Sequence, residues 1–97
     1  MLIDENVYSS ALDVAAVHKD IGFATFVGET TGGGAGSPWY SNFFSLPNTG
    51  IIIRYDPGLV VDVRGRPLEY GIEPHYFNRP EMDALETVLA MIAEGAY

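Results

Sequence analysis

The chain has 97 residues, a formal net charge of -8 from 13 acidic and 5 basic residues, and no cysteine. This length allows one small domain at most, and the acidic balance argues against nucleic acid or an anionic membrane as a partner, since both bind basic surfaces. The lack of cysteine excludes disulfides, thiolate metal sites and a cysteine nucleophile, and no apolar run approaches the roughly 20 residues of a membrane span.

The first predicted elements are a strand end and a helix. Leu2-Ile3 has the character of a short buried strand, and an acidic turn follows it. Ser9 or Ser10 is a suitable N-cap, residues 10–20 carry apolar side chains at helical spacing, and Gly22 predicts the end of the helix. Because the chain opens in what resembles the middle of a strand, we expect it to be cut from a longer domain.

The middle of the chain is predicted to be mostly β-structure. Three apolar runs, residues 23–27, 42–46 and 51–55, have the composition of strands, and residues 59–63 are a weaker candidate. A turn signal at residues 47–50 separates the second run from the third. Residues 51–53 are apolar on both faces, which predicts a cover on both sides of that strand.

The last predicted element is a helix that Asn78 caps, with Pro80 in its first turn and Gly95 at its end. Its predicted apolar face consists of Met82, Leu85, Val88 or Leu89, and Ile92. The order strand, helix, strand, loop, strands, helix predicts a mixed α/β domain.

Residues 28–36 read GETTGGGAG and raise three possibilities. A phosphate-binding loop is excluded, because the segment lacks a Gly-Lys-Ser/Thr ending and no helical pattern follows it. A flexible linker is excluded by the apolar flanks Phe26-Val27 and Trp39-Tyr40. The remaining interpretation is a loop around a peptide substrate, where bare backbone permits close approach.

Ser9 is the candidate nucleophile among the polar residues. It precedes a predicted helix, whose dipole favours a nearby negative charge, and the N–H of Ser10 can donate to an oxyanion. On the residues alone, a plain N-cap stays open as the commoner explanation. His18 and His75 have no metal-ligand spacing, so no metal is predicted.

Four segments in this order resemble a known family: Tyr8-Ser9-Ser10-Ala11, GETTGGGAG, residues 46–50, LPNTG, and residues 68–75, LEYGIEPH. They are similar to the C-terminal half of the catalytic domain of the C-terminal processing peptidases, or tail-specific proteases, in the branch with tricorn protease and the retinoid-binding-protein modules. The resemblance covers about residues 2–92. It implies an α/β fold, the second half of a ClpP/crotonase-like ββα-spiral, with residues 1–97 as the C-terminal part of one peptidase domain.

The resemblance implies a serine endopeptidase that needs no cofactor. Ser9 would be the nucleophile and Ser10 would supply an oxyanion-hole N–H. Gly34 stands where one branch of the family has a lysine base, so the implied machinery is a Ser-His-Ser-Glu tetrad. Its glutamate falls at Glu69 and its histidine lies upstream of this chain. The glycines placed against the substrate are Gly32, Gly33 and Gly34.

The implied partners are a peptide or protein substrate and the upstream part of the same chain, with a homo-oligomer also allowed and nucleic acid excluded. The family also implies an extracytoplasmic location, whether periplasmic, secreted or membrane-tethered. Without the upstream base, the chain alone is expected to be inactive. Two alternatives stay open: a non-catalytic module that binds peptides or apolar ligands, and a structural remnant in which Ser9 is only a cap.

Overall fold

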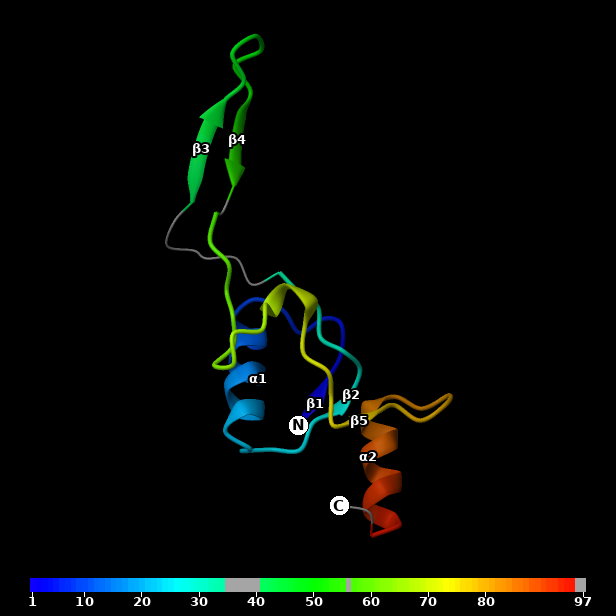
Figure 1. Ribbon diagram of the computed structural model, residues 1–97. Coiled ribbons are helices and arrows are strands. Elements are labelled where there is room, and N and C mark those ends of the chain that lie inside the picture. The colour runs from blue at the N-terminus through cyan, green and yellow to red at the C-terminus, as the bar shows by residue number, and fades with distance from the viewer. Residues whose placement is uncertain (35–40, 56, 96–97) are drawn as a thin grey trace.

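A computed structural model describes residues 1–34, 41–55 and 57–95, and shows a small α/β body from which a β-hairpin projects (Figure 1). The body holds a sheet of three short strands and two helices, and the molecule measures 63 × 29 × 15 Å. The mixed α/β class predicted from the order of elements is confirmed.

The sheet of the body is parallel, with β2 (Val27–Gly28) between β1 (Leu2–Ile3) and β5 (Tyr76–Phe77). Helix α1 (Ser10–Asp20) connects β1 to β2, because two adjacent parallel strands must be joined by a crossover connection. Gly22, with φ 67°, follows the last turn of α1 and ends it as predicted.

The hydrophobic core lies between α1, the sheet and the segment before β5. Phe26 and Leu12 are fully buried there, and burial of such side chains is the main source of stability in a chain this short. The buried cluster consists of Ile3, Leu12, Ala15, Ala16, Phe26, Leu68 and Ile72.

Helix α2 (Ala84–Ala93) begins later than the sequence predicted. Its N-cap is Asp83, which accepts from the N–H of Glu86 at 2.8 Å while its own N–H donates to the Glu86 carboxylate at 2.9 Å. This capping box satisfies two donors at the helix start. The predicted cap, Asn78, is wrong: its N–H donates to the carbonyl of Gly28 at 2.9 Å, beside the sheet. Pro80 accordingly lies in the turn before the helix.

The predicted apolar face of α2 is also wrong. The buried residues of the helix are Thr87 and Met91. Thr87 can be buried because its hydroxyl accepts a hydrogen bond from the N–H of Arg79 at 3.1 Å. The residues predicted to face the core are half-buried or exposed: Met82, Leu85, Val88, Leu89 and Ile92. Gly95, with φ 73°, follows the last turn as predicted. Neither helix of the described residues combines the length and apolar character that a membrane crossing needs.

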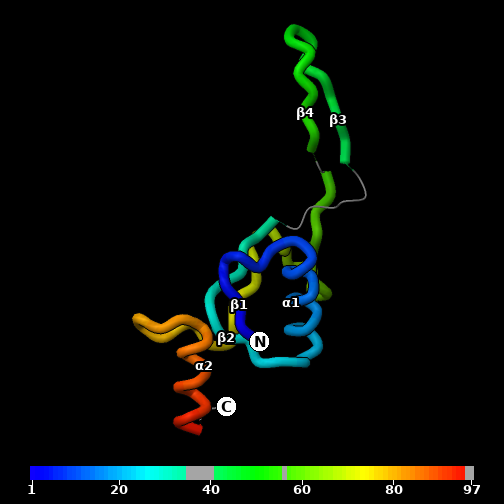
Figure 2. Tube along the Cα trace, turned by 180° about the vertical axis from the view of Figure 1, so that it is seen from behind, coloured from blue at the N-terminus to red at the C-terminus, as the bar shows by residue number. Residues whose placement is uncertain are grey.

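The hairpin pairs β3 (Asn42–Ser45) with β4 (Ile52–Tyr55) in antiparallel register, and Phe44 lies opposite Ile53. Both strands match predicted runs. The predicted cover is not found among the described residues: Phe43, Ile51 and Ile52 are each more than half exposed. Seen from behind, the hairpin stands clear of the body (Figure 2).

Two other strand predictions differ from the structure, and one strand was not predicted. Of the run 23–27, only Val27 is in a strand. The pairing with the segment of β5 begins at Phe26, whose carbonyl accepts from the N–H groups of His75 and Tyr76. Residues 59–63 form a single bridge, between Val61 and Pro67. Strand β5 was not predicted, because two residues between a proline and a polar turn give no alternating pattern.

The Arg79 guanidinium donates two hydrogen bonds of 2.7 Å to the Glu94 carboxylate, and this holds the pKa of Glu94 below its ordinary value of 4.5. A carboxyl whose pKa is lower in the folded protein stabilises the fold above its unfolded pKa, and loses this effect as the pH falls through the folded pKa. We expect Glu94→Gln to lower the urea midpoint near pH 7 and to match the wild type well below pH 4.

The matched control is Glu81→Gln, since Glu81 is exposed and has no ion pair among the described residues. It should leave the urea midpoint near the wild-type value at every pH. A loss in Glu94→Gln that persists in acid would contradict the linkage.

Candidate active site

Ser9 stands at the head of α1 with φ 54° and ψ -128°. A serine that caps a helix normally has an extended backbone and accepts a hydrogen bond from the second or third helical N–H. Ser9 does neither, because its φ is positive and its side chain makes no capping bond. Such a backbone costs about 1–3 kcal/mol and persists only where the surroundings impose it, typically at active sites. The plain N-cap interpretation therefore does not account for Ser9.

Beside Ser9, two backbone donors have no partner in the part of the chain that the structure describes. The first hydrogen bonds at the start of α1 run from Leu12 to the carbonyl of Tyr8 at 3.4 Å, and from Asp13 to the carbonyl of Ser9 at 3.0 Å. The N–H groups of Ser10 and Ala11 have no acceptor among the described residues. Free donors at a helix N-terminus bind anions, so an oxyanion that forms on a group attacked by Ser9 would meet them.

Gly32 and Gly33 are held between two other backbone segments. A Cβ at Gly32 would come within 2.5 Å of the carbonyl oxygen of Glu5, and one at Gly33 would overlap the carbonyl oxygen of Glu69. Glu5 belongs to the loop that leads into Ser9. The two glycines therefore bring the nucleophile loop and the turn of Glu69 together, an approach that any larger residue would prevent.

This packing gives Gly32 and Gly33 a structural function within the chain itself. Gly34 differs from them, because it has φ 89° and open space around its Cβ position. Contact between the three glycines and a substrate stays a prediction. The remainder of the GETTGGGAG segment, Ala35 and Gly36, and the flank Trp39-Tyr40 lie outside the described residues.

Glu69 lies in the short 3-10 helix η1 (Leu68–Tyr70). Its side chain is exposed and makes no hydrogen bond or ion pair with the residues that the structure describes. The turn is anchored by Leu68, which is buried and donates its N–H to the carbonyl of Val60 at 3.0 Å. In both views η1 and the head of α1 lie at the end of the body that faces the hairpin (Figure 1, Figure 2).

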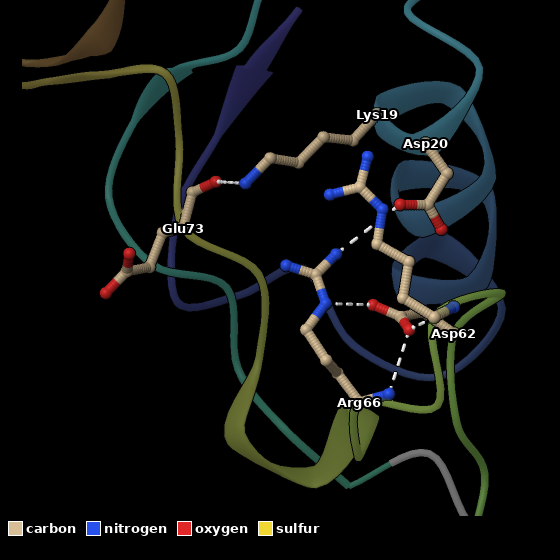
Figure 3. A network of polar contacts seen from close by, with 6 residues as sticks. Lys19, Asp20, Asp62, Arg66 and Glu73 are labelled. Carbon is tan, nitrogen blue, oxygen red and sulfur yellow. Dashed lines mark hydrogen bonds and ion pairs between the residues drawn. The ribbon is translucent and has the colours of Figure 1, made fainter.

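A polar network fixes the segment before η1 (Figure 3). The Asp62 carboxylate accepts from the N–H of Arg64 at 2.8 Å, from the N–H of Arg66 at 2.9 Å and from the Arg66 side chain at 2.6 Å. Burial acts to raise the pKa of Asp62, but the backbone bonds from Arg66 and Arg64, with the Arg66 guanidinium, hold it below its ordinary value. Arg66 also reaches Asp20 at 3.4 Å, which ties this turn to the end of α1.

Both histidine rings make hydrogen bonds with backbone groups of this chain. The Nδ1 of His75 accepts from the N–H of Phe26 at 2.9 Å, so it takes part in the sheet framework. The Nδ1–H of His18 donates to the carbonyl of Val14 at 2.7 Å, and its ring packs edge-on against Phe23. Within the described ranges, no group of three His, Cys, Asp or Glu side chains could hold a metal ion.

Residues 1–77, which include Ser9, Gly32–Gly34 and Glu69, match the model of peptidase family S41. The chain belongs to peptidase family S41. The family match identifies residues 1–77 as sequence of a peptidase domain and confirms the resemblance at the level of the family. Helix α2 lies beyond the part that matches S41. A comparison with curated proteins found no match.

Proposed function

We propose that this S41 chain carries the nucleophile of a serine endopeptidase of the tricorn-like branch of tail-specific proteases, built on a crotonase-like fold. The observation that supports this most strongly is the backbone of Ser9, strained at φ 54° with no capping bond, beside the N–H of Ser10, which has no acceptor among the described residues. A residue that served only as a cap would have no reason to keep that strain.

In the proposed reaction, the Oγ of Ser9 attacks the carbonyl carbon of a peptide bond, and its proton passes to a histidine from outside residues 1–97. The N–H of Ser10 stabilises the oxyanion of the tetrahedral intermediate. The C–N bond then breaks, and the amine leaves with the proton from the histidine. Water hydrolyses the remaining ester and restores Ser9. Glu69 supports the charged groups of this machinery.

The proposal takes a peptide or protein as substrate and the rest of the peptidase domain as the partner of this chain. Of Gly32, Gly33 and Gly34, only Gly34 has open space around its Cβ position, so it is the one proposed to meet a substrate backbone. An extracytoplasmic location and a homo-oligomer stay predictions from the family resemblance.

A fluorophosphonate probe on the full-length protein tests the nucleophile, because it esterifies an activated serine. We expect the wild type to be labelled and Ser9→Ala to lose all labelling. The matched control is Ser10→Ala, which changes the next serine but keeps the backbone N–H that the mechanism uses. It should retain labelling within about tenfold, less than the loss of a whole oxyanion donor.

The contrary outcomes separate the alternatives. A folded wild type that is not labelled would contradict the peptidase and favour a non-catalytic binding module. Labelling that survives Ser9→Ala would place the nucleophile elsewhere in the protein.

A further inference from the structure

Thr31 is a buried polar residue that the proposed mechanism does not use. The residue is only 4% exposed, and it lies in the glycine segment between Gly28 and Gly32. It bonds both backbone groups of Ile72: the N–H of Thr31 donates to the carbonyl of Ile72 at 3.0 Å, and the N–H of Ile72 donates to Thr31 Oγ1 at 2.8 Å. Buried hydroxyls generally have a hydrogen-bond partner. Here both hydrogen bonds of Thr31 join it to the same residue, Ile72, and we call this pair of bonds the clasp.

The clasp holds the turn of Glu69 from its C-terminal side. Gly71 follows the turn with φ 77°, and a Cβ there would overlap the carbonyl oxygen of Thr31, so the two segments are in backbone contact. Leu68 anchors the N-terminal side through the core. Because the Glu69 side chain has no partner among the described residues, its position depends on the backbone that Thr31 holds.

The same residues connect Glu69 to the nucleophile. Thr31 is followed by Gly32, packed against the carbonyl of Glu5, and by Gly33, packed against the carbonyl of Glu69. We propose that Thr31 is a positioning residue for Glu69, and that its hydroxyl holds the backbone of the Glu69 turn in place beside the loop that leads into Ser9. This inference rests on the proposed function, since it assigns Glu69 a part in the reaction.

The test uses peptide cleavage by the full-length protein. Thr31→Val keeps the shape but removes the acceptor, so we expect kcat to fall about 10- to 100-fold with little change in KM, as displacement of a catalytic group by about 1 Å does. Thr31→Ser keeps the acceptor and should restore kcat to within about threefold of the wild type. If Thr31→Val does not fold, Thr31→Cys, which keeps a weak acceptor, replaces it in every comparison.

Thr87→Val is the matched control. Thr87 is 1% exposed and its hydroxyl also accepts one backbone N–H, but it lies on α2, outside the S41 match. It should lower the urea midpoint about as much as Thr31→Val and leave kcat unchanged. An equal loss of kcat in both variants would assign Thr31 to general stability and overturn the inference.

The decisive comparison is a double-mutant cycle with Glu69→Gln. If Thr31 acts through Glu69, Thr31→Val should cost less than about twofold in the Glu69→Gln background, because coupled residues are not additive. A full additional loss there would overturn the positioning by Thr31 while labelling of Ser9 still upheld the proposed function. A wild type that is not labelled, or labelling that survives Ser9→Ala, would instead remove the proposed function, and this inference with it.

Discussion

Gly28→Ala is expected to prevent stable folding, with a loss of more than about 3 kcal/mol in the free energy of unfolding. Gly28 is buried with φ 143°, and a Cβ there would overlap the carbonyl oxygen of Ile3 on the neighbouring strand. Strand β1 could accept the methyl group only by separating from β2, which would break the bond from Glu29 N–H to the same carbonyl. Urea unfolding followed by far-ultraviolet circular dichroism measures the loss.

Gly34→Ala serves as the control for this prediction. Gly34 also has a positive φ, 89°, but nothing lies within 4 Å of its Cβ position. Alanine there should cost only the backbone strain, about 1–2 kcal/mol. If the two variants lost the same free energy, the close approach of β1 and β2 would not be the reason for Gly28.

Phe26→Ala is expected to cost about 3–5 kcal/mol in the free energy of unfolding, because it opens a cavity in the core. Phe26 is 0% exposed, and it bonds His75 through its backbone N–H while its ring lies against the imidazole. A domain of this size has a total stability of about 5–15 kcal/mol, so the variant should unfold at much lower urea or not fold at all.

Phe23→Ala is the matched control, three residues earlier in the same segment. Phe23 is 70% exposed, and its ring makes an edge contact with His18. We expect a loss of about 1 kcal/mol or less. An equal effect of the two substitutions would contradict the position of Phe26 at the centre of the core.

Local patterns predicted the elements whose signals are strong in the sequence. Helix α1 and the two strands of the hairpin lie where spacing and composition placed them. The start and inward face of α2 were wrong for a physical reason. The reciprocal bonds of Asp83 and Glu86 fix the start, and the bond of Thr87 to Arg79 turns a polar residue inward, which hydrophobic spacing cannot reveal.

The candidate site was predicted partly from residues and partly from resemblance. The position of Ser9 before a helix followed from the sequence, whereas its positive φ required the structure. The contact of Gly33 with Glu69 joins residues 36 positions apart, and no local pattern encodes it. The only signal for Thr31 was its place between glycines, since threonine is an ordinary loop residue until its partner is known.

The loops around Ser9 and Glu69 are joined through main-chain atoms. Gly32 meets the carbonyl of Glu5, Gly33 meets that of Glu69, and Thr31 binds both groups of Ile72. Where a residue contributes only its carbonyl group to these contacts, a different side chain leaves the contacts unchanged. Related chains could therefore carry other side chains in place of Glu5 or Glu69, and so a different chemistry, with the same backbone arrangement. Gly32 and Gly33 cannot be replaced in this way, because any side chain there would collide with a carbonyl oxygen.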